Sequence, residues 1–374
     1  MQALIRPRFV WFSRSLPAFQ VCGYTGLIVA ALFGMLLADH MGRSVSIVLL
    51  LVSIAVATFF ALAFWVHVIT GRESLVYFQH IIAILLAGTA GLGMSGRPVL
   101  PYLDLLMMGI GAFSIFGRTG CLMAGCCHGK PCRHGISYGH DHAAEGFPTY
   151  FMHIRLLPVP LIEAVAVLLI TTTGTILIVS GAPPGTALVW YIVTYSGVRF
   201  GLEFLRGDPE RPYFAGFSEA QWTALVLTMI ATLPGVTRIA TEASAAYSAV
   251  VGTAMLVSMI AIASARRFRQ EKIHLLLHPR HVQEVAEILH RLQTNDAGQD
   301  QAISVFETSA GLRLSGGRKR ELTHITFSWN GTNLSERATH VITGLIVLLE
   351  RTRTPGRLQA GSHATYHFLY SNTD

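Results

Sequence analysis

Long apolar runs dominate the first two thirds of this chain of 374 residues. A helix needs about 20 apolar residues to cross the hydrocarbon core of a bilayer. Runs of that length predict an all-α integral membrane protein region with about seven or eight transmembrane helices. The predicted helices lie roughly at 18–38, 44–69, 75–95, 99–117, 158–180, 186–204, 219–236 and 246–263. The first run follows three arginines, but we interpret it as a retained helix rather than a signal peptide.

The pattern changes after residue 265. Residues 1–265 hold 14 Lys+Arg and 11 Asp+Glu, and the much shorter segment 266–374 holds 14 and 10. This charge density is typical of a soluble domain, so we predict a membrane domain at 1–265 and a small soluble α+β domain of unassigned role at 266–374. Its pattern favours a ferredoxin-like βαββαβ order. The predicted elements are strands at 273–277, 302–308, 322–329 and 364–370 and helices at 280–292 and 335–351.

Composition and net charge indicate which classes of molecule the chain binds. The chain is 52% hydrophobic and 13% charged, with a net charge of +7. This charge is modest for the length, so we expect no nucleic-acid partner. We expect the basic residues to contact anionic lipid headgroups at the bilayer surface instead.

The most informative polar segment follows the fourth apolar run, at residues 117–129. Arg118 ends that run, and a buried arginine in a membrane helix needs an anionic partner such as a lipid phosphate. Four glycines surround it, and glycine lets backbone approach a ligand closely. The segment therefore predicts an anion site at the membrane surface, built from Gly117, Arg118, Gly120, Gly125 and Gly129.

Four motifs follow one another along the chain, and a tyrosine motif precedes them in the first helix. They are Gly-Arg-Thr-Gly-Cys-Leu-Met-Ala-Gly-Cys-Cys-His-Gly at 117–129, Leu-Pro-Val-Pro-Leu-Ile-Glu at 157–163, Tyr-Ser-Gly-Val-Arg-Phe-Gly-Leu-Glu-Phe-Leu-Arg at 195–206 and Ser-Glu-Ala-Gln at 218–221, with Tyr-Thr-Gly-Leu at 24–27. This ordered set resembles the bacterial prolipoprotein diacylglyceryl transferase family. The resemblance covers roughly residues 20–230 and leaves 266–374 unexplained.

The resemblance implies a transferase of the bacterial inner membrane that needs no cofactor. Its partners would be phosphatidylglycerol, a prolipoprotein with a lipobox and the lipid bilayer. A precursor thiolate would attack a glycerol carbon of phosphatidylglycerol, and glycerol phosphate would leave. Such a step needs cationic side chains that contact the phosphate, and arginine can make two parallel hydrogen bonds to it. Arg118, Arg199 and Arg206 are the candidates.

The same motifs assign further site residues. The resemblance implies catalytic or supporting roles for Glu163, Glu203 and Tyr24, and substrate contacts for Cys121 and Asp104. Each has an ordinary alternative: Arg199 and Glu203 could be an internal ion pair, Glu163 could complement a helix dipole, and Asp104 could hold backbone in place. Tyr24 could be an interfacial aromatic, and Arg118 could reach the interface from a helix end.

The chain also departs from the family pattern. Cys121 and Cys126 stand where the family has Asn and Glu, and its proposed base histidine falls on Phe78. His80 lies two residues further on, about 200° around a helix. Tyr77 is adjacent but has a high reference pKa of about 10. The proton acceptor is therefore not identified by the sequence.

The cysteines favour two alternatives to this function. One is a divergent phospholipid-dependent transferase with another acceptor. The other is a non-enzymatic membrane metal or redox protein, in which soft ligands would bind zinc or copper. Its candidate ligands are Cys126, Cys127, His128, Cys132 and His134. The thiols could equally be small packing residues or form a disulfide.

Sidedness raises a conflict. With eight helices, the N-terminus, the loop 118–157 and the C-terminal domain share one side of the membrane. That side carries most of the basic residues and should be cytoplasmic by the positive-inside rule. The family resemblance implies the opposite face for the active site.

Overall fold

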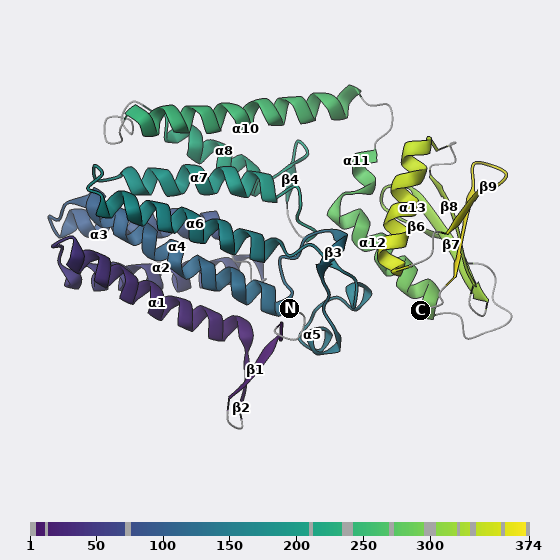
Figure 1. The fold of residues 1–374 in the computed structure, drawn as a ribbon, viewed down its shortest axis with the longest axis horizontal. Coiled ribbons are helices and arrows are strands. Elements are labelled where there is room, and N and C mark those ends of the chain that lie inside the picture. Colours follow the sequence, from purple (N-terminus) through teal and green to yellow (C-terminus); the bar gives the residue numbers. More distant parts are fainter. Residues whose placement is uncertain are drawn as a thin grey trace.

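A bundle of long helices adjoins a small α+β unit in the computed structural model (Figure 1). Residues are described over 5–11, 14–71, 76–208, 212–233, 242–268, 273–294, 304–319, 322–329, 334–352 and 356–371. Within the described residues the bundle holds one large hydrophobic core and a small cluster of Val189, Val193 and Ala231, and the α+β unit belongs to a further core.

Helices occur at all eight predicted positions. Within the described residues, six are long and apolar enough to cross a membrane. The other two, α7 and α8, have 17 and 12 residues. At 1.5 Å per residue they are about 26 Å and 18 Å long, shorter than a hydrocarbon core of about 30 Å. The bundle comprises α1 (Ala18–His40), α2 (Val45–Thr70), α3 (Tyr77–Met94), α4 (Val99–Ala124), α6 (Val159–Val179), α7 (Thr186–Leu202), α8 (Glu219–Ile230) and α10 (Glu242–Phe268).

Helix α4 lies at the centre of the bundle and packs against α1, α2, α3, α6 and α7. It runs two turns beyond the predicted end at residue 117, so Arg118 and Cys121 lie inside it rather than in a loop. Gly125 ends the helix with a φ of 78°, a left-handed conformation that glycine adopts without steric cost. By contrast, α2 buries only Val48 and Leu51, as suits a helix that faces lipid.

The segment between α4 and α6 is folded, although the sequence predicts only a long loop. It contains β3 (Pro131–Ile136), α5 (His140–Ala144) and a 3₁₀ turn, η2 (Thr149–Phe151). An N-terminal hairpin of β1 (Arg8–Trp11) and β2 (Arg14–Pro17) contacts it through an Arg8–Glu145 ion pair of 3.0 Å. A second short hairpin, β4 (Tyr213–Phe214) and β5 (Phe217–Ser218), precedes α8.

The C-terminal unit differs from the predicted βαββαβ order. The predicted strand at 273–277 is a helix, and two strands were not predicted. Its five-stranded antiparallel sheet has the order β6-β7-β8-β10-β9. The elements are α11 (Ile273–Leu276), α12 (Pro279–Thr294), β6 (Phe306–Glu307), β7 (Leu312–Lys319), β8 (Leu322–Trp329), α13 (Glu336–Glu350), β9 (Arg357–Ala360) and β10 (Tyr366–Ser371).

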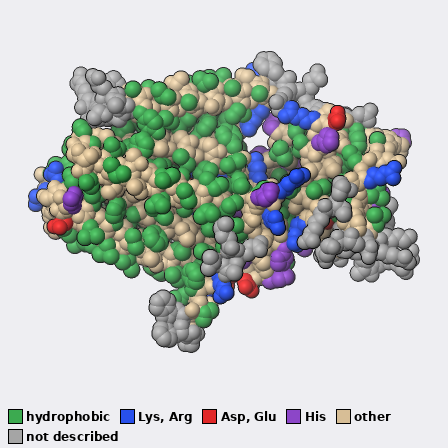
Figure 2. All heavy atoms as spheres, in the orientation of Figure 1, with side chains coloured by type: hydrophobic (Ala, Val, Ile, Leu, Met, Phe, Trp, Pro, Cys, Tyr) green, Lys and Arg blue, Asp and Glu red, His purple; other side chains and the backbone are tan. Residues whose placement is uncertain are grey.

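The C-terminal unit shares its hydrophobic core with the segment after α4. Tyr138 and Phe151 of that segment belong to the same buried cluster as Val285 of α12 and Ile346 of α13. Arg266, near the end of α10, donates to the Gly216 carbonyl at 2.6 Å. Figure 2 shows lysine, arginine and histidine side chains gathered at this end of the bundle, beside an apolar helical body. The N-terminal hairpin, the segment after α4 and the C-terminal unit therefore lie at one end of the bundle.

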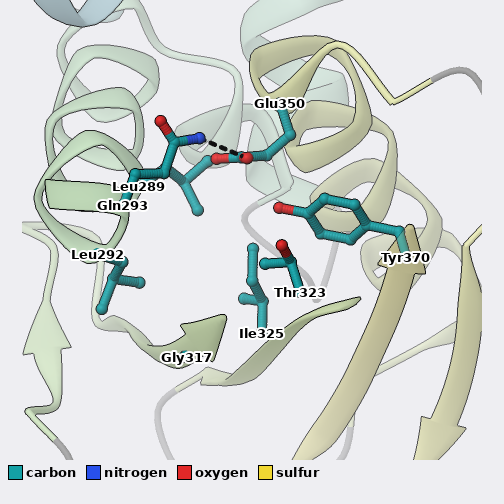
Figure 3. Close-up of a pocket in the computed structure, with 9 residues that line it drawn as sticks. Leu289, Leu292, Gln293, Gly317, Thr323, Ile325, Glu350 and Tyr370 are labelled. Atoms are coloured by element: carbon teal, nitrogen blue, oxygen red, sulfur yellow. Dashed lines mark hydrogen bonds between the residues drawn. The ribbon is translucent and has the colours of Figure 1, made fainter. Parts of the chain in front are cut away.

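A small pocket lies inside the C-terminal unit, between α12, α13 and the sheet (Figure 3). Gln293 donates to Glu350 at 2.6 Å beside it. Leu289, Leu292 and Ile325 make most of the lining apolar. Its small size and mostly apolar lining suit packing rather than chemistry.

Candidate active site at one end of the helix bundle

Glu163 is the centre of a buried ion cluster. Its side chain is fully buried in α6. The carboxylate lies 3.0 Å from Arg118 Nη2 and 3.1 Å from Arg199 Nη1. The Tyr195 hydroxyl donates to the same carboxylate at 2.6 Å. One acidic group thus joins the C-terminal part of α4 to α7.

The cluster continues along the end of α7. Arg199 Nη2 lies 2.7 Å from Glu203, and Arg206 Nε lies 3.8 Å from the same carboxylate. Arg206 also donates to both oxygens of Asp208, at 2.7 and 3.0 Å. Three arginines therefore face three carboxylates. This balance matters because an unpaired buried charge is strongly destabilising.

Aromatic side chains cover the Arg118 side of the cluster. The guanidinium carbon lies 5.4 Å from the centre of the Tyr77 ring, within cation–π range. The Tyr77 hydroxyl bonds to Tyr191 at 2.9 Å and to Ser114 at 3.1 Å. Tyr77 also packs on the Tyr195 ring, with centroids 4.7 Å apart. These contacts hold the guanidinium in one place.

Five of the predicted charged residues are brought together: Arg118, Glu163, Arg199, Glu203 and Arg206. The motifs assign no role to Tyr191, Tyr195 or Asp208. A signal was available, because Tyr191, Tyr195 and Arg199 recur every four residues and so share one face of α7.

Two predicted site residues lie elsewhere. Tyr24 is 67% exposed on α1 and makes no hydrogen bond to the ion cluster within the described residues. Asp104 accepts the amides of Gly185 and Leu188 at 2.6 and 2.8 Å, where α7 begins. It lies fourteen residues before Arg118 on α4, about 21 Å along the axis. These bonds hold the start of α7, and the substrate contact expected of Asp104 stays a prediction.

The glycines mostly let protein segments approach one another. A Cβ on Gly120 would meet Phe19 and Cys22 of α1 at 3.2 Å. A Cβ on Gly129 would lie 2.8 Å from the Leu157 carbonyl, and the Gly129 amide donates to that carbonyl at 2.9 Å. Of the four predicted glycines, Gly117 is the one at which an added Cβ would meet no atom within 4 Å. Gly125 ends α4. The expected approach of these backbones to a ligand is thus largely replaced by packing.

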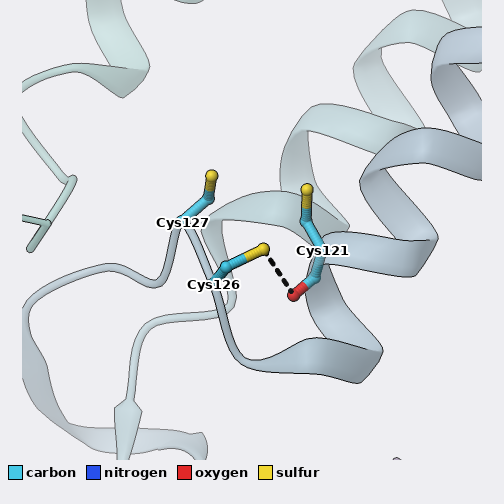
Figure 4. A group of neighbouring side chains, drawn as sticks. All are labelled: Cys121, Cys126 and Cys127. Atoms are coloured by element: carbon cyan, nitrogen blue, oxygen red, sulfur yellow. Dashed lines mark hydrogen bonds between the residues drawn. The ribbon is translucent and has the colours of Figure 1, made fainter. Parts of the chain in front are cut away.

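The cysteines form a group different from the predicted one. The thiol sulfurs of Cys121, Cys126 and Cys127 all lie within 4.8 Å of one another (Figure 4). His128 instead bonds to the Gly129 carbonyl through Nδ1 at 3.0 Å, and the Cys132 thiol bonds to the His134 carbonyl at 3.2 Å. The predicted set of Cys126, Cys127, His128, Cys132 and His134 does not come together, because those last three lie outside this group.

The Cys127 thiol has an unusual environment. Hydrogen bonds with Cys121 and Cys126, helped by the positive charges of Arg206 and Arg118, hold the pKa of Cys127 well below its usual range. Burial opposes this shift. Two arginines of the ion cluster therefore favour the ionised form of the Cys127 thiol.

Residues 15–237 match the prolipoprotein diacylglyceryl transferase family, and this segment is more than half of the chain. The chain belongs to this family. The match ends before the C-terminal unit, and it includes every member of the ion cluster.

Three curated relatives illustrate the distance within the family. Phosphatidylglycerol–prolipoprotein diacylglyceryl transferase of Clostridium tetani is 30% identical over 35% of this chain and 51% of its own length. The Dehalococcoides mccartyi (strain BAV1) enzyme of that name is 27% identical over 40% and 58%. The second such transferase of Clostridium perfringens is 30% identical over 34% and 50%. The chain thus spans about half the length of the curated relatives it matches.

The residue that the resemblance aligns with the family's proposed base is apolar. Phe78 is buried and packs edge-on against Tyr195, with centroids 5.8 Å apart. His80 is also buried, but its ring contacts Phe59 of α2 and its Nδ1 lies 2.9 Å from the Val76 carbonyl. His80 therefore faces away from the ion cluster, as the helical spacing predicts.

Proposed function

We propose that this chain transfers a diacylglyceryl group from phosphatidylglycerol to the thiol of a lipobox cysteine, in a bacterial inner membrane. The thiolate attacks the glycerol carbon, the carbon–oxygen bond to phosphate breaks, and glycerol phosphate leaves with that electron pair. The observation that carries the proposal is the cluster of Arg118, Arg199 and Arg206, largely buried at one end of a membrane bundle within the family segment.

Two arginines are best placed to bind the phosphate. The Arg118 side chain is 11% exposed, more than those of Arg199 and Arg206. Arg206 Nη1 is buried and has no hydrogen-bond partner within the described residues, so it offers a donor directed by its bidentate pair with Asp208. Donors fixed in advance stabilise the charge that develops on a leaving oxygen.

Glu163, Tyr195 and Tyr77 act as positioning residues. Glu163 pairs with Arg118, and Tyr195 donates to the same carboxylate. The Tyr77 ring lies against the Arg118 guanidinium group. Arg199 and Glu203 extend the same support to Arg206. On this proposal residues 1–265 carry the transferase chemistry, and the unit beyond has no catalytic role.

The test uses the full chain in detergent with phosphatidylglycerol and a lipobox peptide. Mass spectrometry should show a diacylglyceryl adduct on the peptide cysteine and released glycerol phosphate. Arg118→Ala should lose both products. Arg97→Ala, an exposed arginine of the segment between α3 and α4, is the matched control and should retain them. Folded wild-type protein that forms neither product would overturn the proposal.

A transferase with a different acceptor is the second candidate. Phe78 favours it, because a phenylalanine side chain cannot accept the thiol proton at the position that the resemblance aligns with the family's proposed base. Release of glycerol phosphate without a peptide adduct would support this candidate over the first.

A further inference from the structure

Three thiols meet where α4 ends, outside the role just proposed. Cys121 lies in the last turn of α4, and Cys126 and Cys127 lie in the turn that follows. Figure 4 shows their side chains on one side of this turn, with the Cys126 sulfur directed toward the Cys121 carbonyl at 3.8 Å. All three are free cysteines.

The backbone is shaped to hold them together. Gly125 turns the chain with a φ of 78°, and Cys127 has a φ of 57°. A left-handed conformation is rare for a residue with a Cβ, and it persists only where the surroundings enforce it. Cys127 would relax by leaving this conformation, but its thiol would then leave Cys121 and Cys126.

We propose that Cys121, Cys126 and Cys127 form a three-coordinate binding site for the soft cation Cu(I). A trigonal thiolate site with metal–sulfur bonds of about 2.3 Å places its sulfurs about 4 Å apart. The sulfurs already lie within 4.8 Å, so closure needs movements below about 1 Å. Cys126 is exposed and provides a route for the ion.

Copper(I) fits this donor set better than zinc. Thiolates select soft cations, whereas structural zinc takes four ligands in nearly every site. No histidine, carboxylate or fourth cysteine joins the group within the described residues. On binding, each thiol releases one proton to solvent, and the copper complex carries two net negative charges.

The experiment uses the full chain, reduced and kept free of oxygen, in competition with a coloured Cu(I) chelator. The wild type should withdraw about one equivalent of Cu(I). Cys126→Ser should weaken this binding by at least about tenfold. Cys22→Ser and Cys132→Ser are matched controls, because neither thiol belongs to the group, and both should bind as the wild type does. X-ray absorption of the copper form should show sulfur neighbours only.

Other outcomes would overturn the proposal. They are no withdrawal of Cu(I), equal loss in Cys132→Ser, tighter uptake of Zn²⁺ than of Cu(I), or a disulfide within the group when the protein is purified without reductant. Elution from gel filtration and the melting temperature of Cys126→Ser show whether that variant is folded. If it is not, Cys127→Ser replaces it with the same expectation.

Discussion

At the scale of the residue, Glu163 determines whether two buried arginines are tolerated. It bridges Arg118 and Arg199 and has no exposure to solvent. Glu163→Gln keeps the shape but leaves positive charge unpaired, so we expect a loss of about 3–5 kcal/mol of stability. The melting temperature in detergent measures it. Glu145→Gln, which breaks the half-exposed pair with Arg8, is the control and should cost no more than about 1 kcal/mol. Equal shifts in both variants would contradict the bridging role.

The planar fork of Arg118 is predicted to matter beyond its charge. Arg118→Lys keeps a cation but cannot make two parallel bonds to a phosphate. We expect transfer to the lipobox peptide to fall at least about 100-fold, as when one donor to a developing oxyanion is removed. Initial rates of adduct formation measure this, with Arg97→Lys as the control. A loss below about fivefold would show that charge alone suffices.

The charged residues of the site were largely predictable, because a charged side chain inside an apolar run is costly to bury and usually has a partner or a function. Arg118, Arg199 and Glu163 met that criterion and lie in one cluster. Asp104 met it as well, yet its carboxylate bonds to the backbone where α7 begins. The sequence could not separate these cases, because distance along a helix says nothing about which neighbouring helix supplies the partner.

At the scale of the element, Gly129 fixes the segment after α4 against the start of α6. A Cβ there would lie 2.7–2.8 Å from Leu157 and Val159. Gly129→Ala should therefore lower stability by about 1–3 kcal/mol, as overpacking does. Gly23→Ala, in α1 with nothing within 4 Å of the new atom, is the control and should raise stability by up to about 1 kcal/mol. Unchanged melting of Gly129→Ala would refute the close packing.

Helix α12 contains a buried histidine, His281, whose neutral form is favoured in the folded protein. His281 is buried, its Nδ1 lies 2.8 Å from the Leu276 carbonyl, and Nε2 lies 3.1 Å from Thr308. Burial lowers the pKa of His281. Below about pH 6.5 the unfolded chain therefore binds a proton that the folded unit rejects, and stability falls as the pH falls.

Hydrogen exchange of the α12 amides should accordingly quicken between pH 7.5 and 5.5, after correction for intrinsic rates. His281→Asn should flatten this dependence. His340→Asn, at an exposed position of α13, should leave it unchanged. A dependence that survives in His281→Asn would assign the effect to another group.

Element types were easier to predict than their limits. Apolar length located the membrane helices, but α4 continued beyond residue 117 because its polar end is buried by other protein segments. The run Ile-His-Leu-Leu-Leu at 273–277 resembled a strand, yet α11 forms there and buries Leu276. Strand β7 was missed because two glycines weaken its pattern, and β9 because all four of its residues are exposed.

At the scale of the whole molecule, the site and the C-terminal unit lie at the same end of the bundle, as expected from the sequence. We therefore predict that a cysteine placed at His134 or at Gln359 reacts with an impermeant maleimide from the same side, and one at Arg97 from the other. All three positions are exposed. Labelling above the wild-type background in intact and permeabilised cells measures this.

The basic residues at this end predict protection of His134→Cys and Gln359→Cys in intact cells. Labelling of both in intact cells would place the site on the outer face, as the family resemblance implies. Labelling of only one would contradict the shared core of the two segments.

The balance of three arginines and three carboxylates has a kinetic consequence. On the proposed function, a phosphate competes with the resident carboxylates for the guanidinium groups, so the free ion gains little net electrostatic energy. A phospholipid held in the same bilayer competes at a high effective concentration that a dissolved ion lacks. Once the diacylglyceryl group has moved, the released glycerol phosphate loses that advantage. Glu163 and Asp208 then pair again with Arg118 and Arg206, which favours release of the product without a separate gate.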